Sequence, residues 1–99
     1  MTYLLARATV EDFDAWKSSF ESNESIRTEN GQRGYQTFRS LENRDEIVVL
    51  FDWDDEKDPR AFFKSEAMRK RMAEAGVQGV PEMTAVEIID QKSALEPSA

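Results

Sequence analysis

Apolar residues recur along the chain at spacings that predict alternating strands and helices. Four segments carry the β-branched and aromatic residues, bounded by turn residues, that are typical of strands: residues 2–10, 34–41, 46–53 and 83–90. After the first of them, Phe13, Trp16 and Phe20 recur at helical spacing, and Gly31 stands where a glycine cap would end the helix. The pattern therefore predicts one uninterrupted helix that ends at Gly31.

An acidic run that begins at Asp52, DWDDEKD, separates the third strand from a second predicted helix. Asp58 suits the N-cap of that helix and Pro59 suits its first position, so the acids fall at a strand end and a helix start. A calcium loop beginning at Asp52 would need Gly at its sixth position and Glu at its twelfth, where Lys57 and Phe63 stand. We therefore interpret the run as a junction and not as a metal site.

The second helix is expected to begin at Pro59 and to close at Gly76. Its inward stripe contains Ala61, Phe62, Ser65, Met68 and Met72. Phe63 lies off this stripe, so we expect its side chain to contact a partner subunit or the C-terminal tail.

The predicted elements follow the order β-α-β-β-α-β, which places the fold in the α+β class. Two right-handed crossovers around a hairpin give a ferredoxin-like, four-stranded antiparallel sheet with both helices on one face. We predict a single domain at residues 1–90 and a flexible tail at residues 91–99, which are small, polar and proline-bearing.

The third strand is apolar on both of its faces. One face carries Ile47, Val49, Phe51 and Trp53, and the other carries Val48 and Leu50. Two helices can cover only one face of the sheet, so the other face is expected to pack on a second copy of the chain. The sequence therefore predicts a homodimer through the sheet, without indicating which face the helices cover.

Charge and composition narrow the possible partners. The 99 residues contain 13 Lys and Arg against 20 Asp and Glu, and the resulting net charge of −7 argues against nucleic-acid binding. The basic triplet at residues 69–71 is expected near a helix end, where cations face solvent and suit the helix dipole. No apolar run has the ~20 residues of a membrane span, and the N-terminus lacks signal-peptide features, so we expect a cytoplasmic location without membrane partners.

The chain contains no histidine and no cysteine. Serine–histidine triads, histidine-bearing metal sites and thiolate chemistry are therefore excluded. Any catalysis would have to use carboxylates, tyrosines, amides, arginine or lysine.

The run GYQTFRSLENRDEIVVLFDW, followed by a helix with AFFKSEAMRKRM, resembles the antibiotic-biosynthesis-monooxygenase type of dimeric α+β barrel. The resemblance covers most of residues 2–89, and its anchors are Gly34-Tyr35, Arg39, Trp53, Phe62 and Lys64-Ser65. It implies relatives that include cofactor-independent oxygenases of polycyclic phenols, haem-degrading enzymes, isomerases, cyclase-like proteins and members without known activity. In the oxygenases, the pocket lies between the sheet and the helices of each subunit.

The haem-degrading branch of this family uses an aromatic residue, an iron-holding histidine and a pocket asparagine. The resemblance places these at Phe62, at Met72 and at or near Arg7, respectively. Because Met72 stands in place of the iron ligand, we do not expect haem degradation by that route, and we expect neither a cofactor nor a metal.

The inward stripe of the first helix turns polar after Phe20, where Asn23, Glu24 and Arg27 follow. Either the helix emerges into solvent there, or these polar groups line a pocket. In the second interpretation, Asn23 and Arg27 would jointly hold an anionic or phenolic oxygen, and Glu24 would accept a proton. These three are our candidate catalytic residues.

Eight further residues are candidates for substrate binding: Arg7, Trp16, Phe20, Tyr35, Arg39, Trp53, Phe62 and Met72. If Leu41 pairs with Ile47 in the hairpin, then Tyr35, Arg39 and Trp53 share one face of the sheet. Alternatively, the aromatic residues fill the core and Arg39 crosses a dimer contact to a carboxylate.

Two classes of function are compatible with these residues. An enzyme would deprotonate a small aromatic phenol or enol and let oxygen react with the carbanion, helped by desolvation and by hydrogen bonds to the oxyanion. Alternatively, the dimer is a non-catalytic small-molecule binder or a structural protein whose pocket is filled by its own side chains. An open pocket lined by the polar candidates would favour the enzyme, and a closed, dry one would favour the binder.

Overall fold

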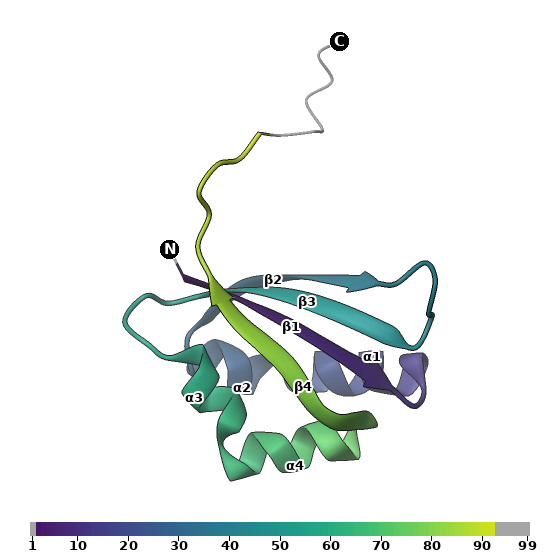
Figure 1. Ribbon diagram of the computed structural model, residues 1–99. Coiled ribbons are helices and arrows are strands. Elements are labelled where there is room, and N and C mark those ends of the chain that lie inside the picture. Colours follow the sequence, from purple (N-terminus) through teal and green to yellow (C-terminus); the bar gives the residue numbers. More distant parts are fainter. Residues whose placement is uncertain (1, 93–99) are drawn as a thin grey trace.

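The computed structural model describes residues 2–92, so most of the predicted tail at residues 91–99 lies outside it (Figure 1). The strands are β1 (Thr2–Val10), β2 (Gln32–Arg39), β3 (Glu46–Trp53) and β4 (Val77–Val86). The helices are α1 (Phe13–Ser22), α2 (Glu24–Glu29), α3 (Pro59–Lys64) and α4 (Glu66–Glu74). The strands form one antiparallel sheet in the order β2-β3-β1-β4, which confirms the predicted ferredoxin-like α+β fold.

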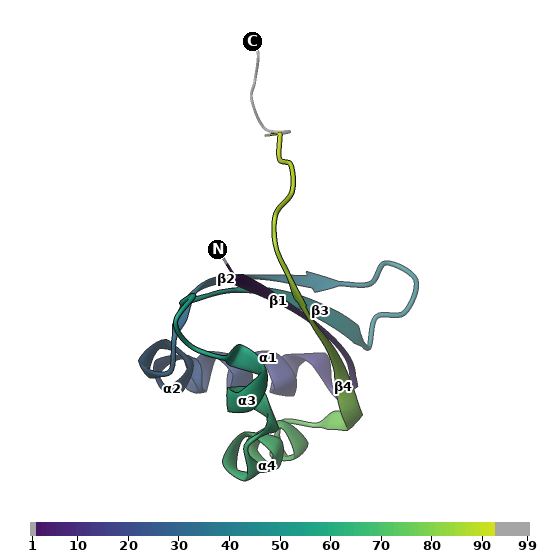
Figure 2. The same ribbon diagram turned by 60° about the vertical axis from the view of Figure 1, so that its left-hand side comes forward.

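All the helices lie on one face of the sheet, and none among residues 2–92 covers the other (Figures 1 and 2). Along β3, every second residue from Ile47 to Trp53 is buried on the helical side. Val48 and Leu50 point to the opposite side, where they are only half-buried. The helices therefore cover the face that carries Trp53.

Aromatic side chains fill much of the space between the sheet and the helices. Trp53 is fully buried, and its ring lies 5.9 Å from that of Phe51, 5.5 Å from that of Phe62 and 5.6 Å from that of Phe63. Its indole Nε1 donates a hydrogen bond of 3.1 Å to the carbonyl of Asn30, just after α2. Trp53 thus joins β3 to α3 and to the segment that leads into β2.

The first predicted helix is interrupted at Asn23, which ends α1 and begins α2. The interruption is slight, because the Asn23 N–H still bonds to the Ser19 carbonyl and the Arg27 N–H bonds to the Asn23 carbonyl. Helical phase is therefore kept across it, and Phe20 and Arg27 are both buried.

The second predicted helix is also divided, at Ser65, where the backbone is extended with ψ of 151°. The Ser65 hydroxyl donates to the Phe62 carbonyl at 2.8 Å and accepts from the Met68 N–H at 3.3 Å, so it caps both pieces. The single predicted stripe fails because α3 and α4 do not share one axis. Phe63 is consequently buried in the core of its own subunit, 5.1 Å from the ring of Phe51, although its place off the predicted stripe suggested an outward side chain.

The acidic run forms the predicted junction between β3 and α3. The Asp58 carboxylate accepts hydrogen bonds from the backbone N–H groups of Arg60 and Ala61, and Pro59 occupies the first turn. These are the N-terminal capping positions expected from the sequence.

The hairpin register differs from the predicted one by two residues. Arg39 lies opposite Ile47, and Tyr35 lies opposite Phe51. Because side chains alternate with a period of two, an even shift leaves the face of each residue unchanged. Tyr35 and Arg39 therefore share the face of Trp53, as expected.

The fourth strand begins and ends earlier than predicted, at Val77–Val86 instead of residues 83–90. Its pairing with β1 shifts at one point, where Gly79, Val80 and Pro81 stay outside the ladder. β4 is an edge strand, and an edge strand tolerates a proline because its outward N–H needs no partner. Gly79, Val80 and Pro81 therefore form a bulge within the strand.

Gly31 occupies a position where no side chain fits. Its φ is +122°, and a Cβ there would lie 2.5 Å from Trp53 Nε1. We expect Gly31→Ala to lower the free energy of unfolding by about 2 kcal/mol or more, because it strains the backbone and displaces Trp53. Urea denaturation followed by tryptophan fluorescence would measure this loss.

Gly34→Ala is the matched control, because a Cβ at Gly34 would meet nothing within 4 Å. Its unfolding free energy should change by less than about 0.5 kcal/mol. Equal destabilisation of the two variants would contradict the packing role assigned to Gly31.

Candidate functional site

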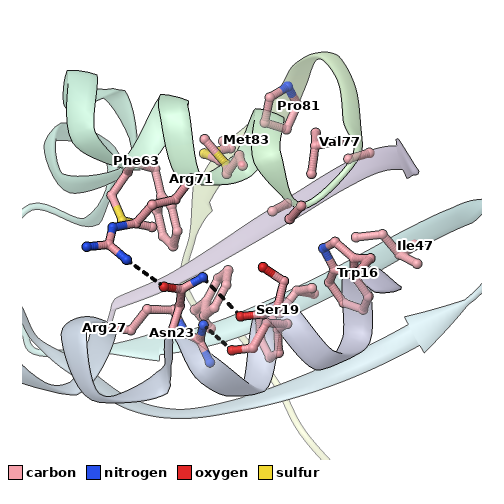
Figure 3. A pocket seen from close by; sticks show the side chains of 18 residues that line it. Trp16, Ser19, Asn23, Arg27, Ile47, Phe63, Arg71, Val77, Pro81 and Met83 are labelled. Atoms are coloured by element: carbon pink, nitrogen blue, oxygen red, sulfur yellow. Dashed lines mark hydrogen bonds between the residues drawn. The ribbon is translucent and has the colours of Figure 1, made fainter. Parts of the chain in front are cut away.

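A cavity of about 70 Å³ lies between the sheet and the helices, with 18 residues around it (Figure 3). Trp16 and Phe20 of α1, Phe63 of α3 and Met72 of α4 contribute apolar walls. The polar groups at its surface come from four residues: Ser19, Asn23, Arg27 and Arg71. No Asp, Glu, Tyr or Lys is among the described residues that line it.

Arg27 is the most deeply buried of these polar residues, with 2% of its surface exposed. Its Nε donates to Gln32 Oε1 at 2.7 Å, and its Nη1 donates to the Phe20 carbonyl at 2.8 Å. The guanidinium lies over the Phe20 ring, 3.8 Å from its centroid. Its Nη2 is buried and has no hydrogen-bond partner among the described residues. Arg27 therefore borders the cavity as a buried cation with one unused hydrogen-bond donor.

The positive charge of Arg27 is not neutralised locally. None of the carboxylates among residues 2–92 forms an ion pair with it. Burial lowers the pKa of the Arg27 guanidinium, and the charge of nearby Glu24 opposes this. Arginine nevertheless stays protonated in proteins, so the cost of burying an uncompensated charge remains. A bound anion would offset part of that cost.

Asn23 connects the two helical segments that flank the cavity, α1–α2 and α3–α4. Its Nδ2 donates to the Ser19 carbonyl at 2.9 Å, and its Oδ1 accepts from Arg71 Nη1 at 2.9 Å (Figure 3). Arg71 comes from α4, so this hydrogen bond spans from the α1–α2 break to the opposite helix. The pair closes one side of the cavity with polar groups.

Five of the eleven residues proposed from the sequence line the cavity: Trp16, Phe20, Asn23, Arg27 and Met72. The first helix therefore does not simply emerge into solvent after Phe20. Asn23 is half-buried and Arg27 is buried, so its polar stripe does face the space under the sheet.

Four other candidates lie on the helical side of the sheet without lining the cavity. Tyr35 is 37% exposed and packs edge-on against Phe20, with ring centroids 5.0 Å apart. The Arg39 guanidinium lies 4.0 Å from the centroid of an α1 ring. Trp53 and Phe62 pack against each other in the core. These contacts give each of the four a structural role.

Arg7 and Glu24 lie away from the cavity. Arg7 points to the uncovered face of the sheet, where its Nε lies 3.3 Å from Glu46 Oε2. It takes the opposite side from its buried neighbours Leu4 and Ala6 because side chains alternate along β1. Glu24 is exposed on α2 and does not line the cavity. The structure thus brings neither of these two residues to the cavity.

Sequence patterns missed several lining residues, of which Arg71, Phe63 and Met83 matter most. Arg71 belongs to the basic triplet interpreted as a solvated helix end, although it lies three residues from buried Met68 on the same helix. That spacing was the available signal, since residues three apart share a helix face. Phe63 and Met83 were missed because the break at Ser65 and the early start of β4 were not predicted.

Two further properties concern residues 2–92. No three His, Cys, Asp or Glu side chains converge there in a way that could hold a metal ion. None of the helices in this part of the chain is both long enough and apolar enough to cross a membrane.

The sequence profile of the antibiotic biosynthesis monooxygenase family matches residues 6–74, which run from the middle of β1 to the end of α4 and include most of the cavity lining. The chain belongs to this family. No curated protein gives a significant match.

Solved structures of several proteins share the fold. SnoaB, a cofactor-independent oxygenase from Streptomyces nogalater, is similar with a TM-score of 0.68 and 15% identity, covering 96% of this chain and 97% of its own. An antibiotic biosynthesis monooxygenase gives 0.66 and 14%, covering 91% and 100%. A conserved protein from Methanosarcina mazei gives 0.64 and 15%, covering 86% and 89%. At these identities, the likeness establishes the family fold and nothing about substrates.

The hydrogen bonds of buried Arg27 predict how its replacement changes the free energy of unfolding. Arg27→Met alone should lower the free energy of unfolding by about 1–3 kcal/mol, because it leaves Gln32 Oε1 and the Phe20 carbonyl without their donor. Adding Gln32→Leu removes one orphaned group and should recover about 1 kcal/mol or more of that loss. Urea denaturation of the three proteins tests this order. A double variant less stable than the single one would contradict it.

Proposed function

We propose that this protein is a homodimeric, cofactor-independent monooxygenase-like enzyme that acts on a small aromatic phenol or enol. The observation that carries the proposal is Arg27, a buried cation next to an aromatic-walled cavity, with an unused donor and no carboxylate partner among residues 2–92. An ionised oxygen of the substrate would satisfy Nη2 and compensate the charge. Asn23, held in place by Arg71, supplies further polar atoms on the same side.

The proton acceptor in this proposal is not a side chain of the cavity, whose described lining lacks carboxylates, tyrosine and lysine. Arg27 would instead lower the pKa of the substrate's own hydroxyl, so that the substrate binds as its phenolate or enolate. The electron-rich carbon of that anion reacts with O2. For an anthrone-like substrate, one oxygen atom becomes the new carbonyl, and the other leaves as water with the two methylene hydrogens. The substrate supplies all four electrons.

The uncovered face of the sheet supports the dimer in this proposal. Val48 and Leu50 of β3 lie there, and Leu5 of β1 and Phe38 of β2 are exposed on the same side. Apolar side chains on adjacent strands form a patch that a second sheet would bury. A cytoplasmic location stays a prediction from the sequence.

The size of the cavity favours a second candidate function. A cavity of about 70 Å³ is smaller than the ~150 Å³ apolar cavity that binds benzene in an engineered protein. A non-catalytic small-molecule-binding or structural dimer is therefore the alternative.

Oxygen uptake distinguishes the two functions. With a panel of anthrone-like phenols, metal-stripped protein should consume O2 at the rate of untreated protein. Arg27→Met/Gln32→Leu should lower that rate at least about a hundredfold, as loss of an oxyanion donor does elsewhere. The pH profile should follow the ionisation of each substrate, without a limb near pH 6.5 set by an enzyme imidazole.

Glu24→Gln is the control in this assay, because Glu24 lies outside the cavity. It should retain the wild-type rate, and a large loss would identify Glu24 as the proton acceptor. Activity that disappears on stripping and returns with iron would overturn the cofactor-free proposal. No uptake with any substrate would favour the non-catalytic binder.

Substitutions at two neighbouring residues of β3 test whether the protein is a dimer. Leu50→Asp places a carboxylate on the uncovered face, so we expect a folded protein that light scattering finds as a monomer of about 11.4 kDa. Val49→Asp places the same charge in the core, where Val49 is 2% exposed, and should cost several kcal/mol and prevent folding. Wild-type protein that is monomeric at low micromolar concentration would contradict the dimer.

A further inference from the structure

A groove of about 710 Å³ adjoins the cavity, between α3, α4 and the edge strand β4. Its volume falls within the roughly 300–1,000 Å³ of typical small-molecule sites, whereas the cavity does not. The bulge of β4 forms one wall, through Gly79, Val80 and Pro81. Bulges of this kind often occur beside functional sites.

The groove and the cavity share part of their walls. Four residues line both spaces: Phe63, Met72, Pro81 and Met83. Two of the four are methionines, whose unbranched side chains adopt new rotamers more readily than branched or aromatic ones. Movement of Met72 and Met83 would therefore join the two spaces into one.

The groove is lined by positively charged residues, although the chain as a whole is negatively charged. Arg60, Lys64 and Arg69 line it, and the described lining residues include no Asp or Glu. The chain as a whole carries a net charge of −7. Surface cations alone do not make a site, but these surround an apolar floor and adjoin the cavity of Arg27, whose buried Nη2 has no partner among the described residues.

We propose that the groove is a second binding subsite, which takes the carboxylate end of an elongated aromatic acid while the opposite, hydroxyl-bearing end reaches Arg27. This inference rests on the proposed function, because it assumes that Arg27 holds the ionised oxygen of a ligand. It adds the substrate class: an aromatic acid with an anionic group at each end. The aromatic body lies on the apolar wall shared by the two spaces, which resolves the mismatch between a small cavity and an aromatic ligand.

Three ligands separate the two ends of the site: a hydroxynaphthoate with its hydroxyl and carboxylate at opposite ends, the matching naphthol, and the matching naphthoate. Their affinities can be measured by calorimetry at low salt. The hydroxynaphthoate should bind most tightly. Its advantage over naphthol should shrink at high salt, because the groove cations are exposed to solvent.

Charge-neutral variants assign each end to its subsite. Lys64→Gln/Arg69→Gln should weaken binding of the two carboxylate-bearing ligands, hydroxynaphthoate and naphthoate, by about three- to tenfold. The affinity for naphthol should stay unchanged. Arg27→Met/Gln32→Leu should weaken binding of the two hydroxyl-bearing ligands and leave naphthoate unchanged. The matched control is Arg44→Gln/Lys70→Gln, which makes the same change in net charge at exposed cations outside the groove and the cavity. It should leave all three affinities unchanged.

The outcomes distinguish failure of this inference from failure of the proposed function. If naphthol binds through Arg27 but the carboxylate adds no affinity, the second subsite is wrong and the proposed function stands. An equal loss in the control pair would also overturn the subsite, because the effect would then be one of net charge. If the carboxylate binds through Lys64 and Arg69 but Arg27 has no effect on any ligand, the bridging ligand and the proposed role of Arg27 are both wrong. Absence of binding by all three overturns both.

Discussion

The architecture depends on the packing of Trp53 at the end of the central strand β3. Its indole is fully buried between the sheet and α3, and its Nε1–H bonds to the chain that leaves α2. This single contact determines how close α3 and the end of α2 approach the sheet, and it requires glycine at position 31. Removal of a buried tryptophan typically costs about 3–5 kcal/mol, a large fraction of the stability of a domain this size.

The two helical segments, α1–α2 and α3–α4, are held by different contacts along their lengths. Near Trp53, aromatic rings of β3 and α3 fill the space between them. Farther along, Ser65 redirects the chain into α4, and the two helical segments are joined across the gap by the Asn23–Arg71 hydrogen bond. The cavity forms where direct apolar packing gives way to this polar bridge. Its position thus follows from where the helices break.

Arg27 makes two hydrogen bonds in the core, but the burial of its charge without a carboxylate partner among the described residues costs stability. Its guanidinium is desolvated, it lacks an ion pair among the described residues, and it leaves one donor unsatisfied. Replacement of Arg27 together with its partner Gln32 by apolar residues should therefore cost less stability than removal of the guanidinium alone. A free-energy cost retained beside a cavity is typical of a site where a ligand supplies the missing partner. The uncompensated cost of burying Arg27 is the main reason for preferring a ligand-binding function to a purely structural one.

The sequence by itself determined the order of strands and helical segments, the class of fold and which residues of a strand share one face. These follow from local features: alternation along β3, helical spacing from Phe13 to Phe20, and the Asp58–Pro59 cap. It also indicated that the polar stripe through Asn23 and Arg27 could face a pocket, since side-chain direction in a helix depends only on phase.

Only the tertiary structure decided which face of the sheet the helices cover, how large the cavity is and which residues join it. The break at Ser65 buries Phe63, and the bulge of β4 brings Pro81 and Met83 to the same cavity as Arg71 of α4. Contacts of this kind between distant parts of the chain depend on the angles between helices and strands, which arise from the packing of the whole core. Local sequence patterns carry the direction of each side chain, but not the distance between side chains that are far apart in the chain.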